Sequence, residues 1–154
     1  MKKIFSLILA VLLALSTLSA ANANVQQSPN SRQVIPMDDG GYMVIEINNS
    51  PTLTRAGTTS LSKYYNRYNE DNMLVWRATL TGYFTYDGRT ATCTSCTCSV
   101  TNFADGWYNI SKTVWPDENI AKATLEMGRR TLGITVQRET HNLSMVCDRY
   151  GNVS

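Results

Sequence analysis

Residues 74–86 alternate between apolar and polar side chains, and no other feature of the sequence restricts the fold as strongly. The even-numbered residues of this segment, Trp76 among them, carry the large apolar side chains, while the odd-numbered residues carry mostly hydroxyl groups. An alternation of this length is typical of a β-strand with one face in a core and the other near water. Asp87 and Gly88 follow it, the pair favoured in two-residue hairpin turns, so we expect a hairpin over residues 73–93.

The same hairpin orients the first cysteine of the chain. Counting back across a two-residue turn sets Phe84 opposite Ala91 and Gly82 opposite Cys93. Opposed residues share one face of a sheet. Cys93 is therefore expected to point into the core.

Short strands and turns follow one another along the rest of the sequence. Runs rich in aromatic and β-branched residues predict further strands at 42–47, 60–68, 107–115, 134–138 and 143–147, the last two as one long bulged strand. Residues 120–130 fit either a helix or, by their alternation, a strand, and the surrounding strands favour a strand. The pattern predicts an all-β fold: an antiparallel β-sandwich, immunoglobulin-like in outline.

The N-terminus has the features of an export signal. Residues 1–23 pass from two lysines through an apolar run too short to span a bilayer to the small-residue cleavage site Ala21-x-Ala23. We expect a signal peptide over 1–23, a flexible leader over 24–41 and a single β-sandwich domain over 42–154, with its main hairpin core in 58–154. The mature protein is expected to be secreted and extracellular, without stable membrane insertion.

Cleavage of the signal changes the charge balance. The whole chain carries 14 Lys and Arg against 12 Asp and Glu, and two of the lysines lie in the signal. The mature chain is then formally neutral. Without a basic surplus it is not expected to bind nucleic acid or an anionic membrane surface.

Several segments resemble an uncharacterised family of short secreted β-sandwich proteins of Gram-positive gut bacteria. The resemblance is carried by Leu74-Val75-Trp76, Thr81–Gly88, Ala91–Ser95, Trp107, Leu132–Gln137 and the ending Cys147…Ser154. It extends over roughly residues 58–154 and implies a β-sandwich with cysteines at the positions of Cys93 and Cys147 and a strand over 120–130. It implies no activity, and Cys96 and Cys98 depart from its pattern.

The chain has four cysteines, which in an exported protein are interpreted first as disulfides. Cys147 lies on the apolar parity of its segment, so a bridge between Cys93 and Cys147 is expected to join the two sheets. Cys96 and Cys98 are then left to pair with each other outside the core.

The cysteine spacing has two other interpretations. The Cα atoms of residues two apart on a straight strand lie at the upper limit of distance for a disulfide. Cys96 and Cys98 could therefore be free thiols of a redox protein. Alternatively, Cys93-x2-Cys96-x-Cys98 could bind zinc, completed by His141 or Cys147. The oxidising compartment favours disulfides, and we expect no metal and no cofactor.

No motif indicates catalysis. His141 is the only histidine, and its sequence neighbours Glu139 and Ser144 lie in no nucleophile elbow. Carboxylates also occur in adjacent pairs, each on an expected turn, where they are solvated rather than held across a cleft. These pairs are Asp38-Asp39, Glu70-Asp71 and Asp117-Glu118. We therefore expect a protein that is not an enzyme.

Aromatic side chains are the remaining candidates for function. Flat exposed rings can contact the faces of sugars or a partner protein. The candidate binding residues are Tyr64, Tyr65, Tyr83, Trp107 and Trp115. The sequence thus predicts a binding module for a glycan or a protein partner at the cell surface. A secreted effector or bacteriocin-like interaction protein is one alternative, and the thiol redox protein is another.

Overall fold

The computed structural model describes residues 30–48 and 56–154, which form eight β-strands and no helix. In chain order these are β1 Asn30–Pro36, β2 Tyr42–Asn48, β3 Gly57–Tyr68, β4 Leu74–Tyr86, β5 Ala91–Asn102, β6 Trp107–Asp117, β7 Ile120–Thr131 and β8 Ile134–Val146. None of the described residues lies in a helix that could cross a bilayer. The expected signal peptide, residues 1–23, lies outside the described residues.

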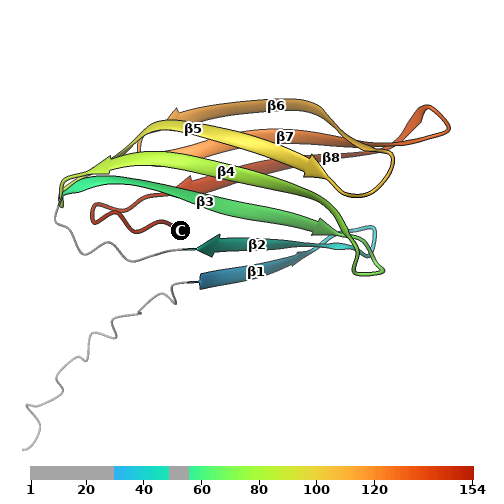
Figure 1. The fold of residues 1–154 in the computed structure, drawn as a ribbon, viewed down its shortest axis with the longest axis horizontal. Coiled ribbons are helices and arrows are strands. Elements are labelled where there is room, and N and C mark those ends of the chain that lie inside the picture. Colours follow the sequence, from blue (N-terminus) through green and yellow to red (C-terminus); the bar gives the residue numbers. More distant parts are fainter. Residues whose placement is uncertain (1–29, 49–55) are drawn as a thin grey trace, which may run out of the picture.

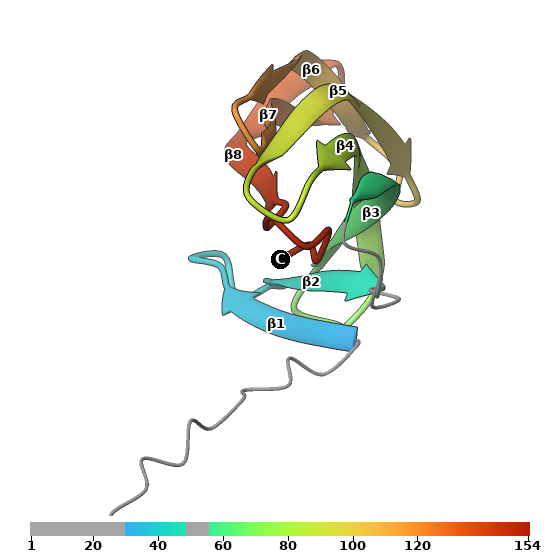
Figure 2. The ribbon, with the colours of Figure 1, turned by 90° about the vertical axis from the view of Figure 1, so that its left-hand side faces the viewer.

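The strands form two antiparallel sheets that pack as a sandwich (Figures 1 and 2). One sheet has the order β1-β2-β3-β4-β5 and the other the order β6-β7-β8. The expected all-β antiparallel sandwich is thereby confirmed. The likeness to an immunoglobulin domain stops at this outline. Within each sheet the strands pair in their sequence order, as in a meander rather than a Greek key.

The first strand corrects the expected leader. We expected a flexible segment over 24–41, yet Asn30–Pro36 is a strand that pairs with β2 along its whole length. Residues 37–41 form the turn between them, closed by a 2.9 Å hydrogen bond from the Met37 N–H to the Gly41 carbonyl. The polar composition of β1 is that of an edge strand exposed to water, which sequence composition does not separate from a loop.

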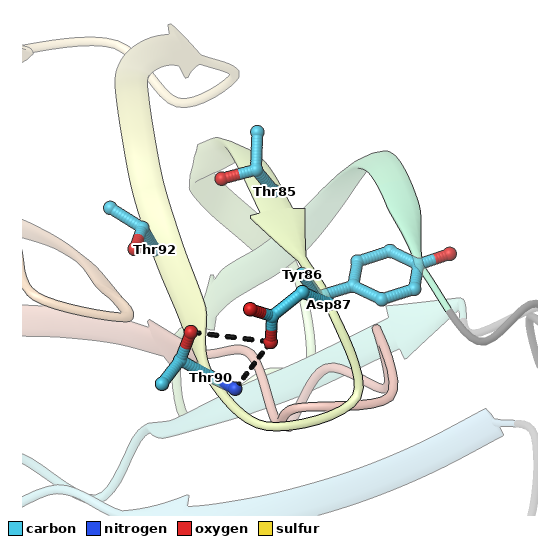
Figure 3. Close-up of a pocket in the computed structure, with 5 residues that line it drawn as sticks. All are labelled: Thr85, Tyr86, Asp87, Thr90 and Thr92. Atoms are coloured by element: carbon cyan, nitrogen blue, oxygen red, sulfur yellow. Dashed lines mark hydrogen bonds between the residues drawn. The ribbon is translucent and has the colours of Figure 1, made fainter.

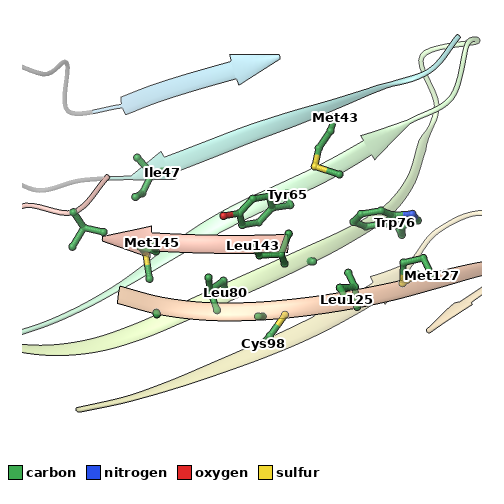
Figure 4. Packing of buried hydrophobic residues seen from close by; sticks show 14 of the residues in the cluster. Met43, Ile47, Tyr65, Trp76, Leu80, Cys98, Leu125, Met127, Leu143 and Met145 are labelled. Carbon is green, nitrogen blue, oxygen red and sulfur yellow. The ribbon is translucent and has the colours of Figure 1, made fainter. Parts of the chain in front are cut away.

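The core lies between the two sheets and is built from the expected parities (Figure 4). Trp76, on the apolar parity of β4, is fully buried, as expected. Gly82 lies on the same inward face of β4 and is buried. A Cβ at Gly82 would lie 2.5 Å from the Phe84 ring and 2.8 Å from Cε of Met145, so glycine is required there by packing.

The β4–β5 hairpin turns at the expected place but in a different register. Its loop has four residues, Asp87–Thr90, so Tyr86 pairs with Ala91 and Phe84 pairs with Cys93. The Asp87 carboxylate accepts hydrogen bonds from the backbone N–H groups of Arg89 and Thr90 at 2.8 and 2.7 Å, which stabilises the longer loop. The predicted pairing of Gly82 with Cys93 is therefore wrong by two residues. A shift of two preserves the face, and Cys93 is buried as expected.

A β-bulge in β5 then changes the face of the cysteines that follow. Tyr83 pairs with Ser95 and Phe84 pairs with Cys93, so Thr94 is an extra residue on β5. Beyond the bulge Cys96 faces Gly82 and Cys98 faces Leu80, both on the core side. Our expectation that Cys96 and Cys98 lie outside the core is wrong for Cys98, which is buried.

The C-terminal half agrees with the sequence pattern. The ambiguous segment 120–130 is strand β7, which confirms the preferred interpretation. The last strand, β8, is one long strand with a register shift opposite Arg129 and Arg130, as expected of a bulged strand. The chain then doubles back, and Cys147 forms an isolated bridge with Val153.

Candidate functional site

The outer face of β3, β4 and β5 is lined with hydroxyl groups. The strand register sets them in rows across the three strands, such as Thr58–Thr85–Thr92 and Ser62–Thr81–Thr97. We name this surface the hydroxyl face. Its members are Thr58, Ser60, Ser62, Thr79, Thr81, Thr85, Thr92, Ser95, Thr97 and Ser99. The signal for it was present in the sequence, since most of the outward positions on these strands are Thr or Ser.

One aromatic side chain stands within the hydroxyl face. Tyr83 lies between Ser60 of β3 and Ser95 of β5, and it is 43 % exposed. The bulge fixes its surroundings, because the Thr94 hydroxyl donates a 3.0 Å hydrogen bond to the Tyr83 carbonyl. An exposed ring among small hydroxyl side chains offers a flat apolar surface with polar groups on both sides.

At one end of the hydroxyl face, two more rings flank an arginine. The Arg77 guanidinium lies 5.9 Å from the ring centre of Tyr64 and 6.0 Å from that of Phe103. Its Nε donates a 2.5 Å hydrogen bond to Oδ1 of Asn66, which fixes the guanidinium between the rings. We name Tyr64, Arg77 and Phe103 the aromatic clamp. Phe103 is 53 % exposed, and the sequence reasoning did not single it out.

At the other end of the hydroxyl face lies a shallow pocket (Figure 3). Thr85, Tyr86, Asp87, Thr90 and Thr92 line it, and its volume is about 120 Å³. Oδ1 of Asp87 also accepts a 3.3 Å hydrogen bond from the Thr90 hydroxyl, so this oxygen is engaged in the loop. Hydrogen bonds from the Thr90 and Arg89 backbone hold the pKa of the Asp87 carboxyl below its usual range. The pocket edge is therefore polar and rigidly held.

The face between the clamp and the pocket carries no charged side chain at its outward positions on β3, β4 and β5. Lys63 belongs to the opposite parity, where it pairs with Leu80 and Ile47 on the inner side of the sheet. Burial lowers the pKa of the Lys63 ammonium, which agrees with this inward placement. The surface is thus polar and uncharged.

The five aromatic residues predicted to bind a ligand lie in three different parts of the fold. Tyr64 and Tyr83 share the outer face of the five-stranded sheet, while Trp115 lies on the outer face of the other sheet and is 38 % exposed. Tyr65 and Trp107 are buried, so neither presents an open ring face to a ligand, which does not favour them as binding residues. Burial raises the pKa of Tyr65 to about 12, and its hydroxyl donates a 2.8 Å hydrogen bond to the Ser144 carbonyl.

The predicted disulfides are not present. All four cysteines are free thiols, including the expected Cys93–Cys147 pair. The backbone N–H of Cys93 donates to the Glu118 carbonyl at 2.7 Å, and that of Cys147 donates to the Asn119 carbonyl at 3.0 Å. These backbone hydrogen bonds place both residues beside the turn between β6 and β7, and their thiols are not bridged. Burial raises the pKa of each thiol to about 11.

The second expected pair, Cys96 and Cys98, is also unbridged. These residues are two apart on a regular strand, which separates their Cα atoms by about 6.6 Å, near the upper limit for a disulfide. Burial raises the pKa of the Cys98 thiol and so reduces its reactive thiolate fraction. This does not favour the redox alternative.

A buried polar cluster was missed by the sequence reasoning. The Arg67 guanidinium donates to Glu139 at 3.0 Å and to Asp39 at 2.5 Å, and His141 lies 3.2 Å from Glu139. The His141 ring also packs against Trp76, with ring centres 5.1 Å apart. The cluster joins the β1–β2 turn to β8. Asp39 lies on the expected turn and its side chain is 42 % exposed, but it is also paired with Arg67.

The described residues do not form a metal-binding site. Within residues 30–48 and 56–154, no three His, Cys, Asp or Glu side chains are grouped so that they could hold a metal ion. The zinc alternative, which combined the cysteines with His141, therefore lacks its set of ligands. His141 instead faces Glu139 and Trp76 on the inner side of the sandwich.

Comparison with known proteins adds no relative. No protein-family model matches the chain, and no significant match appears among curated proteins or solved structures. The fold and the site define a two-sheet antiparallel β-sandwich with an uncharged, hydroxyl-lined outer face. This outer face is the candidate binding surface.

Proposed function

We propose that the protein is an exported, non-catalytic binding module whose hydroxyl face binds a glycan through Tyr83. The observation that supports this most directly is the exposed Tyr83 ring within rows of Thr and Ser. The export signal expected over residues 1–23 agrees with a ligand outside the cell.

The chemistry of the surface suits a sugar. Each hydroxyl group is both a donor and an acceptor, so a row of them can satisfy sugar hydroxyls in several orientations. The Tyr83 ring offers an apolar face against which the C–H groups of a sugar ring can pack. Because the groups are attached to a regular sheet, few of them must be ordered when the ligand binds.

The same features favour a glycan over a protein on this face. The central residues of protein interfaces are enriched in large apolar and aromatic side chains and in arginine. The hydroxyl face has only Tyr83 of this kind near its centre, surrounded by small polar side chains. A protein partner would find little apolar area to bury there.

Binding to immobilised glycans tests the proposal. The protein lacking residues 1–23 is applied to a glycan array, together with the Tyr83→Ala and Trp115→Ala variants. We expect Tyr83→Ala to lose retention while keeping the parental melting temperature. Trp115→Ala is the matched control, because it removes a ring of similar exposure (38 %) on the other sheet. Equal retention by both variants, or no retention of any glycan by the parent, contradicts the proposal.

A second candidate, a secreted interaction protein of the effector kind, is supported by the tip of the β7–β8 hairpin. Figure 1 shows this hairpin projecting beyond the other turns. Leu132 at the tip is 97 % exposed, and Ile134 and Val136 beside it are 69 % and 59 % exposed. Apolar side chains gathered at a projecting tip are typical of a contact with a protein partner. A Leu132→Ser variant that keeps all partner binding would remove this support.

A further inference from the structure

We propose that the ligand is an extended, uncharged polysaccharide chain that lies along β4 and contacts both Tyr83 and the aromatic clamp. This inference rests on the proposed function and names the class of glycan. It follows from the spacing of the rings, the shape of the hydroxyl face and the distribution of charge around it.

The spacing of the rings sets the length of the ligand. Tyr83 pairs with Ser60, whereas Tyr64 lies four residues farther along β3, opposite Thr79. At the rise of an antiparallel strand, the two tyrosines are about 13 Å apart along the sheet. One sugar ring covers only one of these aromatic contacts. A ligand that uses both must be a chain of several sugars.

The shape of the face sets the direction of that chain. Between the row of Thr58–Thr85–Thr92 and the row that contains Arg77 there are eight steps along β4, which is about 27 Å. Across the three strands the face measures only about 10 Å. Rows of hydroxyl groups continue along the whole longer dimension. An extended chain therefore meets the most partners when it follows the strands.

The charge distribution excludes an acidic polymer as the favoured ligand. A carboxylate or sulfate placed between Tyr83 and Thr79 loses water without gaining a cation, because Lys63 faces the other side of the sheet. At the clamp, Nε of Arg77 donates to Asn66 and the guanidinium lies between two rings, at the end of the face rather than along it. A neutral chain avoids this desolvation cost along the whole face.

The test is calorimetric titration of the protein lacking residues 1–23 with neutral glucan, xylan and mannan oligosaccharides, from disaccharide to hexasaccharide. Polygalacturonate and hyaluronate oligosaccharides of matched length serve as acidic ligands. We expect affinity for one neutral series to rise at least about tenfold with length, as the chain comes to span both aromatic contacts. The acidic series should bind more weakly at every length.

Variants locate the two contacts. Tyr83→Ala and Phe103→Ala each should weaken hexasaccharide binding by about two- to tenfold. With the disaccharide, only one of the two substitutions should have an effect. Both side chains are exposed, so the variants are expected to fold, and their melting curves verify this. Trp115→Ala is again the control and should bind like the parent.

The outcomes separate this inference from the proposed function. Binding of a disaccharide as tight as that of the hexasaccharide, or a preference for the acidic series, overturns the extended neutral ligand but leaves glycan binding intact. A Phe103→Ala variant with unchanged hexasaccharide affinity also overturns it. Binding of none of these oligosaccharides, neutral or acidic, overturns the extended neutral ligand. If the glycan array is blank as well, the proposed function fails with it.

Discussion

Replacing Arg67 by Met tests the energetics of the buried polar cluster. Arg67 is 1 % exposed and pairs with Glu139, whose side chain is 10 % exposed, and with Asp39, whose side chain is 42 % exposed. Removing one partner of a buried ion pair costs about 3–5 kcal/mol, because the other charge is left without compensation. The more exposed Asp39 contributes little to this sum. We expect Arg67→Met to lower the free energy of unfolding by about 3–5 kcal/mol.

The acid dependence of stability should change in the same variant. Burial alone raises the pKa of the Glu139 carboxyl, but hydrogen bonds from His141 and Arg67 and their charges outweigh it and hold the pKa below its ordinary value of 4.5. Asp39 behaves alike: hydrogen bonds from Gly41, Gln137 and Arg67 outweigh burial and keep its pKa below 3.8. Carboxyl groups with lowered pKa stabilise the folded state above their unfolded pKa. This contribution is lost as pH falls through the folded pKa.

Urea unfolding of the parent, Arg67→Met, Glu139→Gln and the double variant measures both effects. The double variant should be less destabilised than the sum of the single changes, since each removes the same pair. Between pH 7 and pH 3, Arg67→Met should lose less stability than the parent. Arg89→Met, an exposed change in the β4–β5 loop, is the control. A loss below about 1 kcal/mol in Arg67→Met, or an unaltered acid dependence, would contradict a stabilising role of the Arg67–Glu139 pair.

Three other features can be tested separately. Gly88 has φ 83°, so Gly88→Val should destabilise the fold by about 1–3 kcal/mol, and an unchanged melting temperature would contradict the loop geometry. With iodoacetamide at pH 8, Cys96 should react first. Cys93 and Cys147 should react slowly, because the pKa of each of these two thiols is about 11. Mass spectrometry of the modified peptides identifies which cysteine has reacted. Export should remove the N-terminus after Ala23, and N-terminal sequencing of secreted protein that still begins at the first residue would contradict the signal peptide.

The strand pattern could be predicted because it depends on local chemistry. Alternation alone identified β4 and the face that carries Trp76. For β7 the pattern fitted a helix or a strand, and the surrounding strands favoured the strand that the structure shows. Burying one face of a sheet forces a period of two on the side chains, and a single sequence records that period directly.

The candidate site was predicted only in part. Tyr64 and Tyr83 were identified from the sequence and share one outer face. Tyr65 and Trp107 were not separable from them, because aromatic side chains serve both cores and surfaces. Phe103 was missed since it follows the end of β5, where no alternation indicates its direction.

The fold class, the inward face of β4 and the polar character of its opposite face could be derived from the sequence, because each depends on neighbours along one strand. The tertiary structure alone decided the loop register at Asp87, the bulge at Thr94 that turns Cys98 inward, and the pairing of Arg67 with Glu139. Register and bulges depend on the partner strand, and the Arg67 pair joins residues 72 positions apart. No local pattern encodes such contacts, since they arise only when the two sheets meet.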